Sequence, residues 1–354
     1  MNFKTIFQRL FPFGVLLFIL CSGVWYMTRR EVAPGRRGPG ASFAFDSERY
    51  LETDPTLLIA TEAEPIPVPL AEPLNVGVGP DSRFYVVGDG RLITLQPDGT
   101  AGALALAFEG VARCVAVGAD GTVYVGVDDH VETFRATGEA LARWPVPAAG
   151  ALLSEIAVAG DFAFVTDRRH GALYRYNTTD GEILEQHRGF TVFSSPVLGV
   201  AATAGGTFWV ANPGARELRH YSAEGQVLAQ WSRAGRDLDG FSGCCNPASV
   251  AVLPGGNLLV SELHILRVKI IRPDGSLVGL VAGPDAFAPQ TPHLNVTVDA
   301  DGRMLVLDPL RRQIRVRRSR GNRILVLKLP GRWRGSMEIW GCPVRVWSSW
   351  LVAK

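Results

Sequence analysis

The chain has 354 residues, of which 47% are hydrophobic and 20% are charged, and it contains 39 Gly and 23 Pro. This composition is typical of a folded domain with a large core and frequent turns, and it argues against an intrinsically disordered chain. The 36 basic and 34 acidic side chains leave a net charge of +2, which offers no general electrostatic attraction for nucleic acid. We therefore expect no nucleic-acid partner.

The first 30 residues stand apart in hydrophobicity. Residues 11–27 form an apolar run without a charge, and basic side chains flank it on both sides. Such a run is either a short transmembrane helix or the apolar part of an export signal, and no A-x-A-like cleavage site follows it. We favour an uncleaved membrane anchor over residues 1–30, followed by a linker over residues 31–55. Cleavage and orientation stay open, but the domain beyond is expected on the periplasmic or another extracytoplasmic side.

A unit of apolar strand, tight turn and second apolar strand occurs six times, followed by a third strand and, in the first five copies, by a fourth. The copies begin at Leu74, Arg113, Ser154, Leu198, Ala248 and Leu294. Equivalent positions in their second strands, 39 to 50 residues apart, are Tyr85, Tyr124, Phe164, Trp209, Leu259 and Leu305. A period in the forties with four strands per unit is typical of β-propellers. The sequence predicts an all-β, six-bladed β-propeller over residues 56–317, preceded by an N-terminal transmembrane or signal-anchor helix.

The sixth blade needs an outer strand from elsewhere in the chain, because a closed ring leaves only short sheet edges exposed. Two segments could supply it, LLIAT at residues 57–61 and ILVLKL at residues 324–329. The second lies in a basic, Trp-rich tail over residues 318–354 that diverges from the repeat pattern. We therefore predict that the N-terminal segment closes the ring.

Blades four to six carry the most specific sequence pattern. It includes WVANPGARELRHYSAEGQVLAQW, GFSGCCNPASVAVLPGG and SELHILRVKIIRPDGSLVGLVAGPDAF. Through these segments the chain resembles a bacterial family of NHL-repeat proteins, and the GCCNP motif at residues 243–247 is the most specific element. The resemblance implies a propeller that is exported or anchored by its N-terminal segment, and it implies no particular reaction.

In a propeller, the loops between second and third strands and the connections between blades lie on one face, around the mouth of the central channel. We call it the mouth face and expect a binding site there. The candidate residues are His130, Asp167, His170, Asn212, Cys244, Cys245, Glu262, His264 and Asp308. The three histidines occupy nearly equivalent places and could hold a divalent metal that activates water. The alternative is that these polar residues simply face solvent.

Two smaller groups allow more than one interpretation. Arg267 and Lys269 alternate along a predicted strand, so they share a face near Glu262, and we interpret this as a salt-bridged or solvated face rather than an anion site. Cys244 and Cys245 fall in the long connection between blades four and five. They could form a structural turn with inert thiols, a strained vicinal disulfide, or a soft-metal site completed by a nearby His. We favour the turn.

Two classes of function remain. The first is a membrane-anchored NHL-repeat propeller that binds or scaffolds a protein or a small ligand. The second is a metal-dependent hydrolase or lyase that acts at the channel mouth. The sequence does not identify catalytic residues, and a divalent metal is the one cofactor that it suggests.

Overall fold

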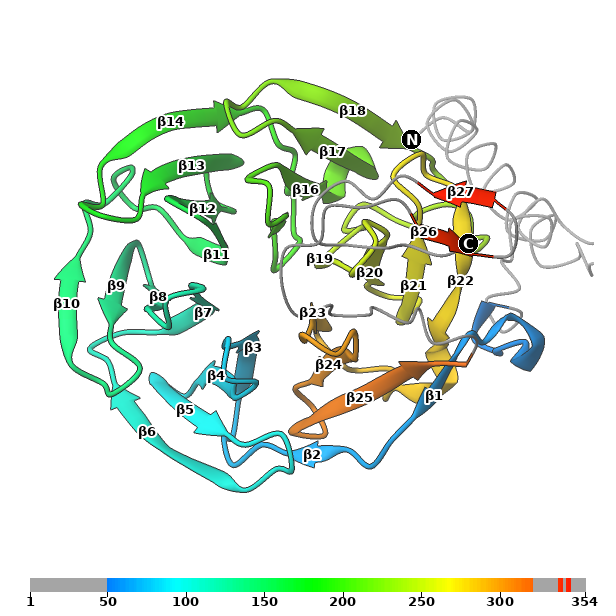
Figure 1. Ribbon diagram of the computed structural model, residues 1–354, viewed down its shortest axis with the longest axis horizontal. Helices are drawn as coiled ribbons and strands as arrows, with labels where there is room; N and C mark the ends of the chain where they lie inside the picture. The colour runs from blue at the N-terminus through cyan, green and yellow to red at the C-terminus, as the bar shows by residue number, and fades with distance from the viewer. Residues whose placement is uncertain (1–49, 321–336, 340–341, 345–354) are drawn as a thin grey trace, which may run out of the picture. The chain divides into compact units, whose positions relative to one another are not determined.

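The computed structural model describes residues 50–320, 337–339 and 342–344. Within them, six antiparallel sheets stand around a central channel, and their innermost strands line it (Figure 1). The predicted all-β six-bladed propeller is thereby confirmed. The chain divides into two compact units, Met1–Arg49 and Tyr50–Lys354, and the predicted anchor at residues 1–30 lies outside the described residues. No helix in the described part of the chain is long and apolar enough to cross a membrane.

The first three blades each use four consecutive strands, numbered here from the channel outward. Blade one consists of β3 (Pro73–Val78), β4 (Phe84–Gly88), β5 (Arg91–Leu95) and β6 (Ala101–Ala107). Blade two consists of β7 (Ala112–Val117), β8 (Val123–Val127), β9 (His130–Phe134) and β10 (Ala140–Arg143). Blade three consists of β11 (Leu153–Ala159), β12 (Phe162–Asp167), β13 (Ala172–Asn177) and β14 (Ile183–Arg188).

The last three blades follow the same plan with one difference. Blade four consists of β15 (Gly199–Ala202), β16 (Phe208–Asn212), β17 (Glu217–Tyr221) and β18 (Val227–Ser232). Blade five consists of β19 (Val250–Val252), β20 (Leu258–Glu262), β21 (Arg267–Ile271) and β22 (Leu277–Ala282). Blade six consists of β23 (Asn295–Val298), β24 (Met304–Asp308) and β25 (Gln313–Ser319), completed by β1 (Ala60–Glu62) and β2 (Ile66–Pro67). Three short 3-10 helices are η2 (Pro55–Leu57), η3 (Pro213–Ala215) and η4 (Pro284–Ala286).

The second strand of each blade explains the repeat signal in the sequence. Every residue of β4, β8, β16, β20 and β24 is buried, because each blade packs against a neighbour on both faces. Such strands read as continuous apolar runs rather than as alternating patterns. Outer strands such as β10, which is exposed throughout, contribute little to the core and carry a weaker sequence signal.

The N-terminal segment closes the ring, as predicted. In β1, Thr61 pairs with Arg318 of β25, and in β2, Ile66 pairs with Ile314, so both strands run beside β25 in Figure 1. Pairing with β25 covers only the end of the predicted residues 57–61 and extends to Glu62, because Leu57 belongs to η2 and the next two residues contact β22. Leu58 instead bridges to Leu280 of β22. The rival segment, residues 324–329, lies outside the described residues.

The turn between third and fourth strands has a packing role besides its turn geometry. Gly181 and Gly275 adopt φ of 73° and 86°, values that disfavour any side chain with a Cβ. A Cβ at Gly181 would also collide with the ring of Trp144, and one at Gly275 with Trp231. Each Trp comes from the preceding blade, so the turn of one blade supports the outer edge of the blade before it.

The divergent tail contains a short hairpin. Its strands β26 (Met337–Ile339) and β27 (Cys342–Val344) pair with each other and form a separate sheet.

Candidate functional site

Most of the acidic and amide residues predicted for the mouth face hold its loops in place. Asp167 accepts a hydrogen bond from the Leu152 N–H at 3.0 Å, and Asn212 accepts one from the Thr191 N–H at 2.8 Å. Each belongs to the end of a second strand, and each donor belongs to the connection that enters the same blade. Asp308 instead accepts the Arg311 N–H within its own loop. These side chains satisfy backbone groups that would otherwise lack partners near the core.

The three predicted metal-binding histidines have different surroundings. His130 is buried, with its ring nitrogens 3.1 Å from Asp129 and 3.0 Å from Glu132. His170 is exposed and lies 2.5 Å from Asp167, whereas His264 is exposed in a left-handed backbone conformation. Among the described residues, no group of three or more His, Cys, Asp or Glu lies close enough together to hold a metal ion.

The GCCNP motif forms a tight connection into blade five. The Asn246 side-chain amide donates to the carbonyls of Ser242 and Leu263, and its oxygen accepts the Leu263 N–H at 2.6 Å. Cys244 is exposed and Cys245 is buried; both are free thiols, with their Sγ atoms 3.5 Å apart. The connection is therefore a turn held by Asn246, and the disulfide and soft-metal interpretations of the two thiols stay predictions.

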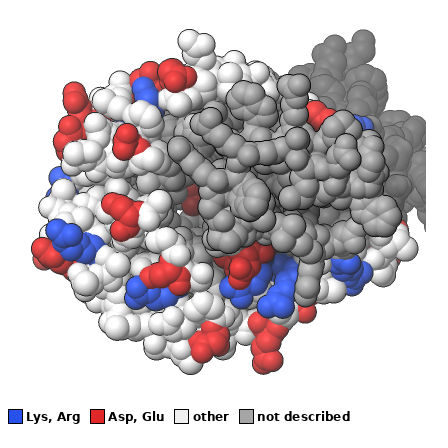
Figure 2. All heavy atoms as spheres, in the orientation of Figure 1, with Lys and Arg blue, Asp and Glu red and all other residues white. Residues whose placement is uncertain are grey.

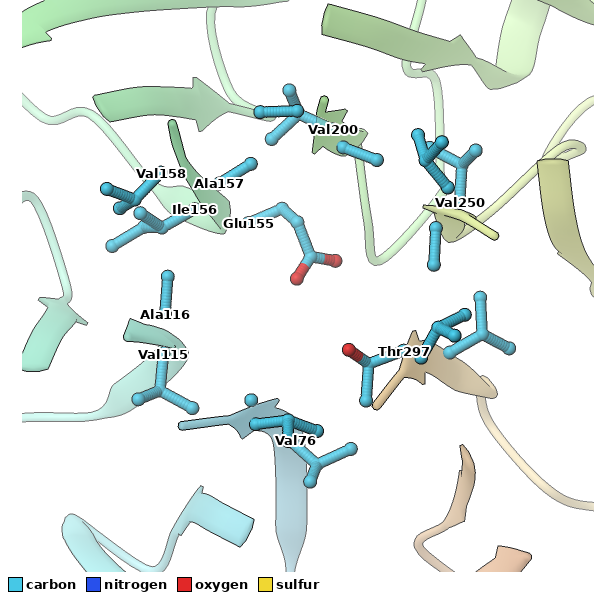
Figure 3. A pocket seen from close by; sticks show the side chains of 18 of the residues that line it. Val76, Val115, Ala116, Glu155, Ile156, Ala157, Val158, Val200, Val250 and Thr297 are labelled. Atoms are coloured by element: carbon cyan, nitrogen blue, oxygen red, sulfur yellow. The ribbon is translucent and has the colours of Figure 1, made fainter. Parts of the chain in front are cut away.

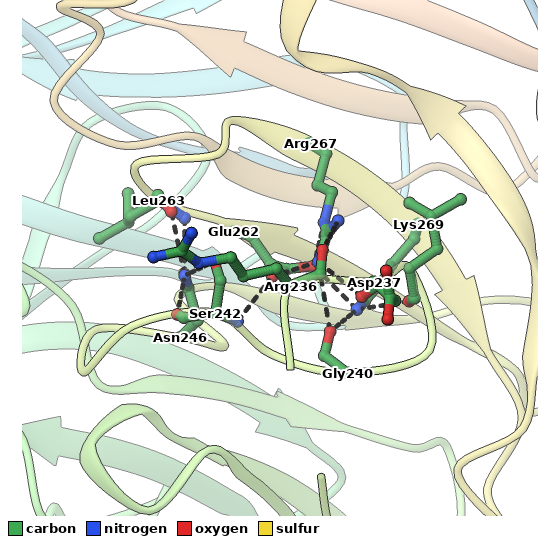
Figure 4. A network of polar contacts seen from close by, with 10 residues as sticks. Arg236, Asp237, Gly240, Ser242, Asn246, Glu262, Leu263, Arg267 and Lys269 are labelled. Carbon is green, nitrogen blue, oxygen red and sulfur yellow. Dashed lines mark hydrogen bonds and ion pairs between the residues drawn. The ribbon is translucent and has the colours of Figure 1, made fainter. Parts of the chain in front are cut away.

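Glu262 belongs to a buried ion cluster rather than to an exposed site (Figure 4). Its carboxylate lies 2.7 Å from Arg267 Nε and 2.8 Å from Lys269 Nζ. Both cations also donate to backbone carbonyls in the connection between blades four and five, including that of Gly240. Burial lowers the pKa of Lys269 to about 8, although the attraction of Glu262 opposes this. The predicted shared face of Arg267 and Lys269 is confirmed as a salt-bridged one.

The central channel contains a residue that the sequence analysis did not select. The innermost strands of all six blades enclose a space of about 200 Å³, lined mainly by Val and Ala. Figure 3 shows the carboxyl group of Glu155, from β11, pointing into this space. Glu155 is 7% exposed. It is the one charged side chain among the described residues that line the channel.

Hydrogen bonds from two other blades hold Glu155. Asn75 of β3 donates to its Oε1 at 2.6 Å, and Asn295 of β23 lies 3.3 Å from its Oε2. Burial raises the pKa of Glu155 from 4.5 to about 8, against the opposing effect of these two amides. A carboxyl group with such a pKa exchanges its proton near neutral pH.

Strand register explains how Glu155 could have been found. Counted from the second-strand markers, the equivalent positions in blades one to six are Asn75, Cys114, Glu155, Gly199, Ser249 and Asn295. Alignment of the six repeats therefore isolates Glu155 as the single charged residue in this set. Two positions further along each strand, the residues are Gly or Ala in five blades and Thr297 in the sixth. These small side chains keep the channel open.

Charge on the surface is mixed. On the part of the face in Figure 2 that grey atoms leave visible, acidic and basic side chains are intermixed, and neither sign gathers into one continuous patch. The channel carboxyl is thus a more distinctive electrostatic feature than this surface.

Comparison with family models and with curated proteins finds no match. Among solved structures, the fold is similar to a streptogramin B lyase, with a TM-score of 0.52 and 11% identity over 73% of this chain and 98% of that one. It is also similar to a gluconolactonase from Xanthomonas campestris, with a TM-score of 0.54 and 16% identity over 73% of this chain and 97% of that one. A third similar structure is the WD40 β-propeller domain of Doa1, with a TM-score of 0.51 and 14% identity over 70% of this chain and 78% of that one. At these identities the likeness shows the propeller fold alone.

Proposed function

We propose that the chain is a ligand-binding propeller of the NHL-repeat type, held at a membrane by residues 1–30, with the propeller on the extracytoplasmic side. Its ligand is a small molecule that enters the central channel. The observation that carries this proposal is the Glu155 carboxyl group, which is buried, is the one charged side chain among the described residues that line the channel, and is oriented by Asn75 and Asn295. A concave site in which a few positioned polar groups converge is the usual place for a small ligand.

The energetics favour a role in binding over a role in folding. Burying a carboxyl group without an opposite charge costs stability, and the five equivalent positions in the other blades are uncharged. The propeller architecture therefore does not require an acid at this place. By contrast, Glu262 pairs with two buried cations and is accounted for by the structure that it stabilises.

A second candidate is a hydrolase or lyase acting at the same channel. A carboxyl group whose pKa is about 8 is suited to general acid or base catalysis near neutral pH. Two of the similar structures bear the names of a lyase and a gluconolactonase. The metal-dependent form of this candidate would rely on His130, His170 and His264, which are not among the described residues that line the channel.

The test of ligand binding uses the full-length chain in detergent and a variant with a filled channel. Ala157 lines the channel, so Ala157→Leu reduces its volume, while Ala140→Leu places the same side chain on the exposed strand β10. Thermal unfolding is measured with a panel of small amines, acids, alcohols and sugars. We expect at least one class to raise the melting temperature of the wild type and of Ala140→Leu, but not of Ala157→Leu. Equal shifts in all three proteins would rule out the channel as the site.

The enzyme candidate is tested separately by incubation with a streptogramin B antibiotic and with gluconolactone, with and without added divalent metal. Chromatography detects the products. Turnover that disappears in Glu155→Gln or in His130→Ala, and persists in Ala140→Leu, would replace the binding proposal by the enzymatic one.

A further inference from the structure

The amides around Glu155 are oriented by the backbone. Asn75 Oδ1 accepts the Val115 N–H at 3.2 Å, and Asn295 Oδ1 accepts the Val76 N–H at 3.0 Å. Both amide oxygens are thus committed to neighbouring strands, and both NH2 groups are turned toward the carboxyl group. Among the described residues, the side chains around Glu155 offer it hydrogen-bond donors, and no second carboxylate lines the channel to help it bind Mg²⁺ or Ca²⁺.

Glu155 also lacks a cation. No Lys or Arg occurs among the described residues that line the channel. The groups near the carboxyl on the neighbouring strands are Asn75, Asn295, the Ser249 hydroxyl and the Cys114 thiol. Burial raises the pKa of Cys114 well above its usual value, so this thiol stays neutral. The ionised form of Glu155 therefore has hydrogen-bond partners without a balancing positive charge.

We propose that the channel ligand is a small primary ammonium ion with a short apolar chain, and that its ammonium group pairs with Glu155. This inference rests on the proposed binding function. The ammonium group supplies both the missing charge and N–H donors for the carboxylate oxygens, and the Val and Ala walls accommodate the chain. The size agrees, because a cavity of about 150 Å³ is sufficient for benzene and the channel space is about 200 Å³.

Binding of such a ligand releases a proton. At pH 7 the empty site holds Glu155 mainly as the neutral acid, because its pKa is about 8. When the ammonium ion enters, the O–H bond of the acid breaks, the proton leaves to solvent, and a carboxylate–ammonium pair remains. No oxidant or further reactant is needed. A neutral ligand of the same shape releases no proton.

Calorimetry on the full-length chain in detergent at pH 7 tests the inference with n-butylamine, n-butanol and butyrate as probes. Titrations in two buffers of different ionisation enthalpy count the protons released. We expect butylammonium to bind at least about tenfold more tightly than butanol, as a charged hydrogen-bonded pair would, with release of about one proton per ligand. Glu155→Gln should lose both this advantage of butylammonium over butanol and the proton release.

Three outcomes would overturn the inference. Equal affinity for butylamine and butanol would show a channel that binds apolar chains without using the carboxylate, and the proposed binding function would stand. Binding of butylamine without proton release in the wild type would place the amine elsewhere, and this measurement needs no variant. Binding of Ca²⁺ or Mg²⁺ that depends on Glu155, without binding of butylamine, would identify a metal site. The proposed binding function itself fails if the small-molecule panel shifts the melting temperatures of the wild type, Ala157→Leu and Ala140→Leu equally.

Discussion

Two buried carboxyl groups in this propeller differ in their partners. Glu262 contacts Arg267 and Lys269 within 2.8 Å, so its negative charge is balanced where it is buried. Glu155 contacts only neutral groups among the described residues. The first arrangement stabilises the connection between blades four and five, and the second leaves a group that titrates inside the channel.

We predict that Glu262→Gln destabilises the propeller strongly. The substitution removes the carboxylate that contacts both buried cations, and breaking a buried ion pair in this way costs about 3 kcal/mol or more. Denaturant unfolding of the variant measures the loss. The control is Glu139→Gln, which removes an exposed pair with Arg135 and should change the free energy of unfolding by less than about 0.5 kcal/mol. Similar effects of the two substitutions would contradict the role assigned to the cluster.

Glu155 makes stability depend on pH in a defined direction. In the folded state its pKa is raised from 4.5 to about 8, so the folded chain holds this proton more tightly than the unfolded chain. That contribution to stability is complete below pH 4.5 and is lost as the pH rises to 8. Relative to the wild type, Glu155→Gln should gain on the order of 3 kcal/mol between pH 5 and pH 8. Unfolding curves at both pH values check this, and a constant difference would refute it.

At the scale of single elements, close approach between neighbouring blades selects Gly and small residues on the innermost strands. A Cβ at Gly199 of β15 would lie 2.6 Å from the Ala248 carbonyl oxygen, next to β19, and a Cβ at Gly77 of β3 would lie 3.0 Å from the Val115 carbonyl oxygen of β7. These obstacles are backbone atoms, which cannot move without displacing a strand. The spacing of the channel wall therefore depends on these glycines.

We predict that Gly199→Ala lowers the free energy of unfolding by about 1–3 kcal/mol, because the added methyl group overpacks a rigid contact. The control is Gly205→Ala in the turn of the same blade, where the nearest atom to an added Cβ is the Thr203 hydroxyl at 3.8 Å. Denaturant midpoints of the two variants compare them directly. A smaller effect at Gly199 than at Gly205 would show that the inner strands can separate without loss.

For the whole molecule, ring closure joins residues that are far apart in the chain. Glu62 of β1 forms ion pairs with Arg315 and Arg317 of β25, in addition to the strand pairing. The backbone N–H of Arg320 also donates to the Ile59 carbonyl. This closure couples the first and last blades, so the ring is expected to unfold as one unit.

Removal of residues 1–73 should abolish cooperative thermal unfolding, because it deletes β1 and β2 and leaves the edge of β25 unpaired. A chain that ends after residue 320 retains every propeller strand and should unfold with a melting temperature close to that of the full-length protein. Circular dichroism during heating distinguishes the two. The opposite result would be a folded protein without residues 1–73 and an unfolded protein without the residues after 320. It would mean that the tail closes the ring.

The propeller architecture could be predicted from the sequence because this architecture depends on local signals that recur six times. Buried second strands such as β8 and β20 read as continuous apolar runs, and the intervening Gly-containing turns mark their ends. The same reasoning identified the N-terminal closing strand from the divergence of the tail, although pairing with β25 begins only at Ala60, after two residues that contact Leu280 of β22.

The tertiary structure alone decided which polar residues hold the loops in place and which one points into the central channel. Asp167, Asn212 and Glu262 looked like site residues because they lie at the mouth face, yet each accepts a backbone N–H from the connection that enters its own blade. Glu155 looked like part of an apolar strand, yet its carboxyl group accepts hydrogen bonds from Asn75 and Asn295, which lie far from it in the sequence. A sequence determines the period of a propeller because period is local, whereas the composition of its channel depends on how six distant strands converge.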